Sequence, residues 1–162
     1  MKAALISLGS TSSQMTLDAM KSYFEQVDAI DLRTIEVNLT AKNLQILIKD
    51  QPIGNYDCVY AKGSAKYAPL LCSITTALSK TAYMPISAQA FIVGKNKLLT
   101  QLWLLEKNIP MPKTYLSSSP KAAKSILSKI HYPIIIKLPE STQGKGVLFA
   151  DSYAAAASLL DA

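Results

Sequence analysis

The sequence predicts an α/β protein: an open parallel sheet with helices, followed by a smaller α+β unit. In the first part, short apolar segments alternate with stretches of helical periodicity, which is typical of parallel sheets. Toward the C-terminus, an isoleucine-rich segment and a second apolar segment flank a Gly-Lys-Gly loop within residues 132–149. This arrangement predicts two strands joined by a glycine-rich connection.

Length and hydropathy bound the class of protein. The chain has 162 residues, and at roughly 150 residues per domain it holds one or two small domains. No apolar run approaches the ~18 residues of a membrane-spanning helix, and the N-terminus lacks the features of a secretory signal peptide. No membrane association is expected.

The charge pattern indicates which binding partners to expect, and the cysteines indicate the redox state of the cellular compartment. The net charge is +6, and Arg33 is the single arginine, so the positive charge rests on scattered lysines. Proteins that read bases or clamp phosphodiesters rely on arginine, so no nucleic-acid partner is expected. Cys58 and Cys72 lack C-x-x-C spacing, which predicts free, buried thiols in a reducing compartment and a cytoplasmic protein.

The first unit begins with a predicted strand at residues 2–8. Thr11 and Gln14 have the spacing of a capping box at a helix start. The serines of this turn can serve as helix caps or, alternatively, bind an anion at the helix N-terminus. An apolar helical stripe is then predicted at i, i+3, i+4 and i+7, made of Met20, Tyr23, Phe24 and Val27.

The remaining elements of the first unit follow the same logic. A second strand is predicted at residues 29–32 and another at residues 57–61. Apolar alternation in residues 44–48 predicts a hairpin arm that turns at Lys49-Asp50, with a short helix as the alternative. A helix is predicted at residues 66–78, and the unit ends near residue 94.

The second unit opens with a helix from Lys97 to Asn108, because asparagine tolerates the left-handed C-cap and Pro110 cannot continue a helix. A strand is predicted at residues 111–116. Ser119 before a proline predicts the cap of the next helix. Lys97 in a first helical turn opposes the helix dipole, so it is either simply exposed or paired with a bound anion.

The segment Ile134–Lys137 predicts a short buried strand, since β-branched side chains suit a covered, pleated surface. Ile135 and Lys137 share one face of that strand, so the ammonium group is expected at the end of an apolar slot. The glycines of the following loop let main-chain N–H groups turn toward an anion. A plain turn between two strands is the alternative. Neither a Walker A nor a Rossmann motif is present.

Three segments together resemble the ATP-grasp superfamily, and most closely the RimK-like carboxylate–amine ligases. They are the segment from Lys97 to Thr114, the segment Tyr132–Lys137, and the loop Ser141-Thr-Gln-Gly-Lys-Gly-Val147. The resemblance implies a pre-ATP-grasp domain at residues 1–94 and the N-terminal ATP-grasp subdomain at residues 95–162.

The resemblance implies a role for each matching position. Lys137 would contact the adenine side and the α-phosphate of ATP, and Lys97 would reach the nucleotide phosphates. A lid over the β- and γ-phosphates would comprise Ser141, Thr142, Gln143, Gly144, Lys145 and Gly146. Such enzymes use ATP to convert a carboxylate into an acyl-phosphate, which an amine then attacks; lysines and Mg²⁺ neutralise the charge.

The sequence departs from this family at several points. Asn96 stands where aspartate often precedes the lysine, and Ala61-Lys62-Gly63 stands where an Arg-x-Gly is common, which puts a first-domain substrate contact in doubt. The hinge strand, the acidic Mg²⁺ ligands and the acceptor-binding arginine of the family have no counterpart here. Glu36-Val37-Asn38 resembles the metal pair but sits in the wrong domain. No catalytic residue or metal ligand is therefore predicted within these 162 residues.

The expectation is thus the first half of a ligase that joins an amino acid, glutamate above all, to a carboxylate. The C-terminal ATP-grasp subdomain is expected to be absent, and the chain alone is expected not to turn over ATP. Two alternatives stay open: another ATP-grasp ligase, of the D-alanine ligase or carboxylase kind, or a non-catalytic module that binds nucleotide or a partner. An apolar face left without its second subdomain predicts self-association.

Overall fold

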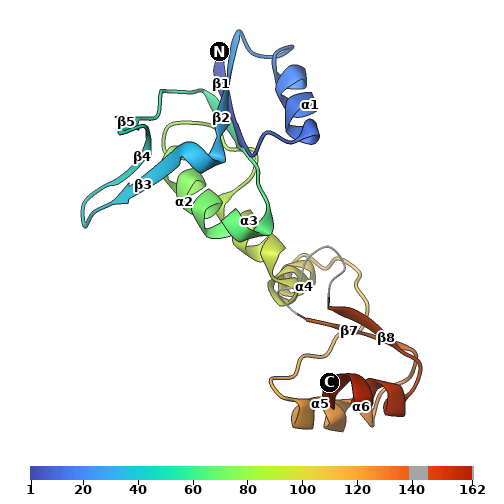
Figure 1. The fold of residues 1–162 in the computed structure, drawn as a ribbon. Helices are drawn as coiled ribbons and strands as arrows, with labels where there is room; N and C mark the ends of the chain where they lie inside the picture. Colours follow the sequence, from blue (N-terminus) through green and yellow to red (C-terminus); the bar gives the residue numbers. More distant parts are fainter. Residues whose placement is uncertain (139–145, 162) are drawn as a thin grey trace. The chain divides into compact units, whose positions relative to one another are not determined.

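The computed structural model describes residues 1–138 and 146–161. The chain divides into two compact units, Met1–Lys95 and Asn96–Ala162 (Figure 1), and each is described by itself. Among the described residues, no helix has both the length and the apolar character needed to cross a membrane.

A parallel sheet of three strands forms the centre of the first unit, in the order β2-β1-β6. These strands are β1 (Lys2–Ser7), β2 (Gln26–Asp31) and β6 (Cys58–Ala61). In register, Leu5 of β1 lies between Ala29 and Tyr60. The central strand β1 is buried along nearly its whole length, as expected for a strand covered on both faces. The predicted parallel α/β sheet is confirmed.

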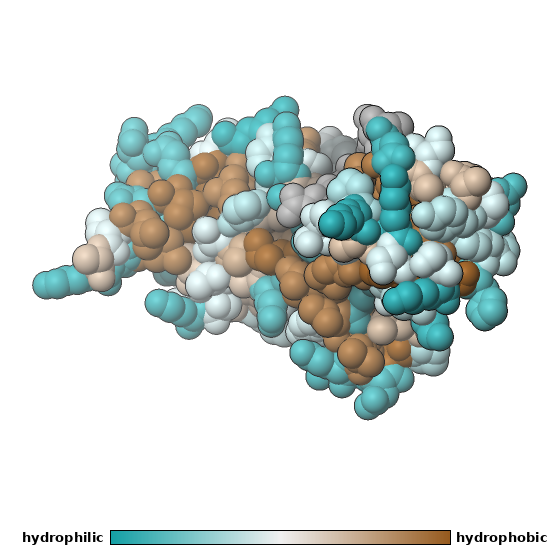
Figure 2. All heavy atoms as spheres, turned by 90° about the horizontal axis from the view of Figure 1, so that it is seen from below, coloured by the Kyte–Doolittle hydropathy of each residue, from teal (hydrophilic) through white to brown (hydrophobic). Residues whose placement is uncertain are grey.

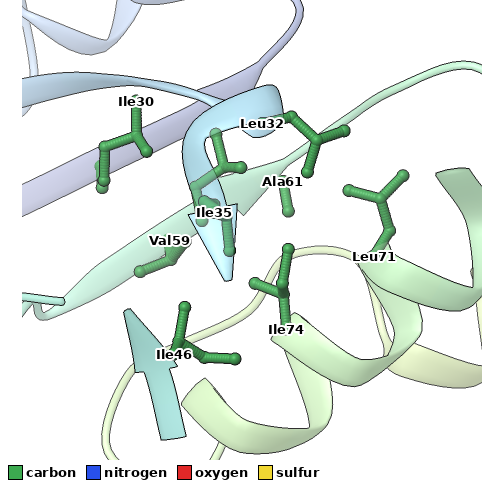
Figure 3. Packing of buried hydrophobic residues seen from close by; sticks show 10 residues of the cluster. Ile30, Leu32, Ile35, Ile46, Val59, Ala61, Leu71 and Ile74 are labelled. Atoms are coloured by element: carbon green, nitrogen blue, oxygen red, sulfur yellow. The ribbon is translucent and has the colours of Figure 1, made fainter. Parts of the chain in front are cut away.

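Helices cover both faces of this sheet. Helix α1 (Thr11–Met20) lies on the side opposite α2 (Ala68–Leu78), as Figure 1 shows, and α3 (Ala88–Lys95) packs against α2. Short 3₁₀ turns, η1 (Leu32–Thr34) and η2 (Ala65–Tyr67), follow β2 and precede α2. The main core forms between the sheet and α2 (Figure 3), where Ile6, Leu71 and Ile74 are at most 1% exposed.

A second sheet, antiparallel and in the order β3-β4-β5, packs against α2 in the first unit. Its strands are β3 (Ile35–Leu39), β4 (Leu44–Ile48) and β5 (Gln51–Pro52). Lys49 and Asp50 both have positive φ, 51° and 59°, as the tight hairpin turn requires. The predicted hairpin is therefore confirmed at this turn, and the alternative of a short helix is wrong. The sequence prediction missed β3.

The predicted helical stripe after residue 20 is wrong. Helix α1 ends at Met20, and Val27 already belongs to β2. Tyr23 is 78% exposed, so it does not contribute to a buried face. Parallel pairing with β1 overrides the local helical periodicity, because β2 gains a full ladder with β1. The helix cap is also one residue earlier than predicted: the Ser10 hydroxyl accepts a hydrogen bond from the main-chain N–H of Ser13.

The described residues of the second unit form a two-stranded antiparallel ribbon and three helices. The elements are α4 (Lys97–Glu106), α5 (Pro120–Leu127), β7 (Ile134–Lys137), β8 (Val147–Ala150) and α6 (Tyr153–Asp161). Leu127, Ala150 and Ala156 form its core, joined by Ile134 and Ile136 from the ribbon. Ser119 caps α5 as predicted, with its hydroxyl accepting from the Ala122 N–H. Asn108 has the predicted left-handed φ, at 54°.

Two predictions for the second unit are wrong. Residues 111–116 form neither strand nor helix, since no neighbouring strand pairs with them in the described part of the chain. The segment Ile134–Lys137 is a strand, but only one of its faces is covered, and Ile135 is 52% exposed. Three consecutive isoleucines therefore do not mark burial on both faces here.

A hydrogen-bonded cluster in the first unit gives a pH-dependent stability. The Tyr56 hydroxyl donates to Asp28 at 2.9 Å, and Lys2 lies 3.1 Å from the same carboxylate. Burial, with this hydrogen bond, raises the pKa of Tyr56 to about 12, against about 10 for a free tyrosine.

We therefore expect Tyr56 to contribute stability in full below about pH 10. This contribution falls away as the pH rises through the folded-state pKa of about 12. Urea unfolding between pH 9 and 12 measures it: the Tyr56→Phe variant, which keeps the ring, should lose less stability than the native chain over that interval. Equal losses in the two proteins would contradict the assignment.

Candidate nucleotide-binding site

Hydrogen bonding holds the start of α4 and the end of β7 together in the second unit. The Lys97 ammonium, in the first turn of α4, donates a hydrogen bond at 3.0 Å to the main-chain carbonyl of Leu138. Leu138 directly follows Lys137 in the chain. The structure thus brings the first predicted site lysine to the ribbon end that carries the second.

The helix start at Lys97 is fixed by its cap. The Asn96 side-chain oxygen accepts from the main-chain N–H groups of Leu98 and Leu99, at 2.9 and 3.2 Å. An aspartate there would place a full negative charge beside Lys97, whereas the asparagine caps the helix while staying neutral. The asparagine noted in the sequence therefore keeps the helix cap without adding a charge.

Lys137 lies on the open face of the ribbon. It pairs in register with Val147, and Ile135 pairs with Phe149, so these four side chains share one face. Ile135, Val147 and Phe149 are 52%, 39% and 64% exposed. The opposite face, with Ile134 and Ile136, packs on the core formed with α5 and α6. One face of the ribbon is thus structural, and the other presents apolar surface beside a cation.

Within residues 1–138 and 146–161, the Lys137 ammonium forms no ion pair and no hydrogen bond. This differs from Lys124, whose ammonium lies 2.7 Å from the Asp161 carboxylate. A cation without a counter-ion next to exposed aliphatic and aromatic side chains suits a ligand with a flat apolar part and an anionic part. A nucleotide has both parts.

Gly146 closes the ribbon end opposite Leu138. The Leu138 N–H donates to the Gly146 carbonyl at 2.9 Å, which extends the ladder one pair beyond Lys137 and Val147. Gly146 has φ of 67°, a conformation that side chains resist. A β-carbon there would also lie 2.9 Å from the Leu138 Cδ1. Both observations explain why the site needs glycine at this position.

The remaining predicted lid residues, Ser141, Thr142, Gln143, Gly144 and Lys145, lie outside the described residues. The structure therefore describes Lys97, Lys137 and Gly146 of the predicted set. Sequence reasoning missed Phe149, although its place two residues from Val147 on the return strand puts it on the same face.

A separate apolar groove lies in the first unit, and none of the predicted site residues lines it. Its lining comprises Met1, Met20, Phe24, Asp57, Cys58, Tyr60, Tyr83 and Pro85. Figure 2 shows that hydrophobic side chains reach the surface in several places on the face it depicts, between hydrophilic ones. Exposed apolar surface alone therefore does not single out a site, and Lys137, which has no ion pair with any described residue, is the more specific feature.

Comparison with solved structures identifies the fold. The chain is similar to a RimK domain ATP-grasp protein from Sphaerobacter thermophilus, with a TM-score of 0.68 and 15% identity over 99% of this chain and 59% of that one. It is also similar to D-alanyl-alanine synthetase A from Vibrio cholerae, with a TM-score of 0.61 and 16% identity over 99% of this chain and 55% of that one. The fold is that of the N-terminal portion of an ATP-grasp protein.

Sequence comparison is more specific about the type of ATP-grasp domain. Residues 94–162 match the RimK-like ATP-grasp domain, which confirms the resemblance found in the sequence. A probable alpha-L-glutamate ligase of Aliivibrio salmonicida is 28% identical over 93% of this chain and 51% of its own length. One from Methanococcoides burtonii is 27% identical over 99% of this chain and 55% of its own length. The chain spans about half the length of the curated relatives it matches.

Proposed function

We propose that this chain supplies the N-terminal part of an ATP-dependent ligase that joins glutamate to a carboxylate. The observation that carries the proposal is Lys137 on the exposed apolar face of the ribbon, where no described residue forms an ion pair with it, with Lys97 held at the same ribbon end. Two relatives named as probable alpha-L-glutamate ligases support glutamate as the amino acid.

In this proposal the ribbon is the floor of the nucleotide site. The base lies over the exposed side chains of Ile135 and Phe149, and the Lys137 ammonium neutralises a phosphate. Lys97 approaches the phosphates from the helix start, and residues 141–146 form the lid over the outer phosphates. These roles need charge and position, not proton transfer, and therefore suit lysines and main-chain N–H groups.

The chemistry balances with ATP as the only activating reagent. The carboxylate oxygen attacks the γ-phosphorus, the bond to the bridging oxygen breaks, and ADP leaves. The glutamate amine then attacks the acyl carbon, loses a proton and displaces phosphate, which gives an amide. The cations of this chain hold the triphosphate in place during the first step.

Magnesium belongs to the proposal only through the nucleotide. A solved ATP-grasp ligase of similar fold, PsnB, was captured with Mg and ADP. Within the described residues, no group of three or more histidine, cysteine, aspartate or glutamate side chains gathers to hold a metal. Cys58 and Cys72 are free thiols, which supports a reducing compartment such as the cytoplasm.

The test uses the full-length protein with ATP, Mg²⁺, L-glutamate and a short peptide bearing a free C-terminal carboxylate. We expect release of ADP and phosphate that depends on both the peptide and glutamate, with a peptide mass gain of one glutamyl residue. With hydroxylamine in place of glutamate, the activated carboxylate should be trapped as a hydroxamate.

Two results would contradict the proposal. Formation of AMP and pyrophosphate would replace the acyl-phosphate with an acyl-adenylate. ADP release with D-alanine but not with L-glutamate would favour the D-alanine ligase class, whose fold the chain also shares.

A further inference from the structure

The antiparallel sheet of the first unit has two edges of different character. One edge is β5, which has only two residues, Gln51 and Pro52. Proline has no N–H, so this edge is too short and too poor in donors to pair with another strand. The other edge is β3, which has five residues, Ile35–Leu39, with neither proline nor lysine among them. Proline and lysine, two of the usual protections of an edge, are therefore absent from β3, and Glu36 is its one charged residue.

Main-chain groups of β3 point outward from this edge. The Ile53 N–H donates to the Ile46 carbonyl at 2.9 Å, so Ile46 directs its main chain toward β5. Val37, opposite Ile46 in register, therefore directs its own N–H and C=O away from β4. By the two-residue repeat, Leu39 does the same. Neither residue has a main-chain partner within residues 1–138 and 146–161. The Ile35 N–H is already taken by the Leu32 carbonyl.

We propose that β3 pairs antiparallel with β3 of a second copy of this chain, with Val37 opposite Leu39 of that copy. In this register the N–H and C=O groups of Val37 and Leu39 are all paired across the two-fold axis. Ile35 is left out, as its occupied N–H requires. The two antiparallel sheets then form one continuous sheet, and the pairing closes at two copies because the β5 edges cannot extend it.

The side chains of β3 fit the same register. Leu39 is 74% exposed, and it would be covered by Val37 of the second copy on the face shared with Ile46. On the other face, Asn38 meets Asn38, and Glu36 meets Thr40. No like charges then lie directly opposite one another, and amide side chains meet at the axis. A second copy therefore pairs the outward main-chain groups of β3, covers the Leu39 side chain and places no like charges opposite one another.

Sedimentation of the 162-residue chain over a range of concentrations tests the proposal. We expect a monomer–dimer equilibrium without larger species. Leu39→Lys should weaken dimerisation at least tenfold, since it buries an ammonium group against Val37. Gln45→Lys is the matched control: it makes the same charge in the same hairpin, on an exposed position of β4 away from the edge, and should leave dimerisation unchanged.

Cysteine cross-linking tests the register. Residues at the two-fold axis of the proposed pairing are a non-hydrogen-bonded pair with Cα atoms about 4.5 Å apart, within the range of a disulfide. Asn38→Cys should therefore form a covalent dimer in oxidised glutathione, beyond any background from Cys58 and Cys72 in the native chain. Glu36→Cys should not, because Glu36 faces Thr40 of the second copy.

Three outcomes would overturn the proposal. The chain could remain monomeric at every concentration, which would leave the β3 edge for another occupant such as an extended peptide. The dimer could persist in Leu39→Lys, which would place the interface elsewhere, for instance on the exposed ribbon face of Ile135 and Phe149. Cross-linking by Glu36→Cys in preference to Asn38→Cys would contradict the register. The first and third outcomes do not bear on nucleotide binding by Lys137, whereas an interface on the ribbon face would compete with the proposed nucleotide site.

Discussion

Replacing Lys137 with alanine is expected to lower the affinity of the full-length protein for ATP by about 10- to 100-fold. A hydrogen bond to a charged group contributes about 1.5–3 kcal/mol, and each 1.4 kcal/mol is tenfold in the dissociation constant. No described residue supplies a counter-ion that would compete with the phosphates for the Lys137 charge. Isothermal titration calorimetry of both proteins with ATP and Mg²⁺ measures the change.

Lys121→Ala is the matched control for this experiment. Lys121 belongs to α5 of the same unit and is exposed, so the substitution removes the same charge away from the ribbon face. We expect its ATP affinity to match that of the native protein, and the gap between the two variants to narrow as salt is raised. Equal affinities of the native protein and Lys137→Ala would refute the site.

Gly146→Ala is expected to destabilise the ribbon end by about 1–3 kcal/mol. Alanine resists the positive φ of 67°, and its β-carbon would lie within 3.1 Å of three Leu138 side-chain atoms. Hydrogen exchange at the amides of β7 and β8 measures the effect, since local opening should become about tenfold more frequent or greater. ATP affinity should fall with it, because Leu138 also holds the Lys97 ammonium.

Gly94→Ala is the control for this substitution, and we expect it not to destabilise the ribbon. Gly94 lies in α3, where a β-carbon would meet no atom within 4 Å and the φ angle is ordinary. Alanine in a helix is more favourable than glycine by about 0.5–1 kcal/mol. Exchange at β7 and β8 should therefore stay unchanged, and α3 should exchange more slowly. If Gly146→Ala behaved like Gly94→Ala, the strained ribbon end would be disproved.

The sequence predicts local features of this fold better than long-range ones. Ser119 as a cap, Asn108 as a left-handed terminus and the turn at Lys49-Asp50 are all specified by residues within a few positions of one another. Such features need only local hydrogen bonds and φ preferences, so they are readable from sequence. Strand pairing depends on partners far along the chain. Pairing with β1 places Val27 in a strand, although the local sequence has helical periodicity.

The same distinction between local and long-range features explains how much of the candidate site the sequence predicts. The alternation that puts Ile135 and Lys137 on one face is local, and the sequence predicted it. Whether that face is covered depends on distant elements, and Ile135 is 52% exposed where a buried strand was expected. The hydrogen bond from Lys97 to Leu138 joins residues 41 positions apart. Only the family resemblance, and no pattern within this sequence, pointed to that proximity.

A crystal structure of the full-length protein with a non-hydrolysable ATP analogue tests the central claim most directly. We expect the Lys137 ammonium within about 3 Å of a phosphate oxygen, the base against the ribbon face of Ile135 and Phe149, and Lys97 facing the same triphosphate. An analogue bound elsewhere, with Lys137 still in solvent, would contradict the assignment of this ribbon as the nucleotide site.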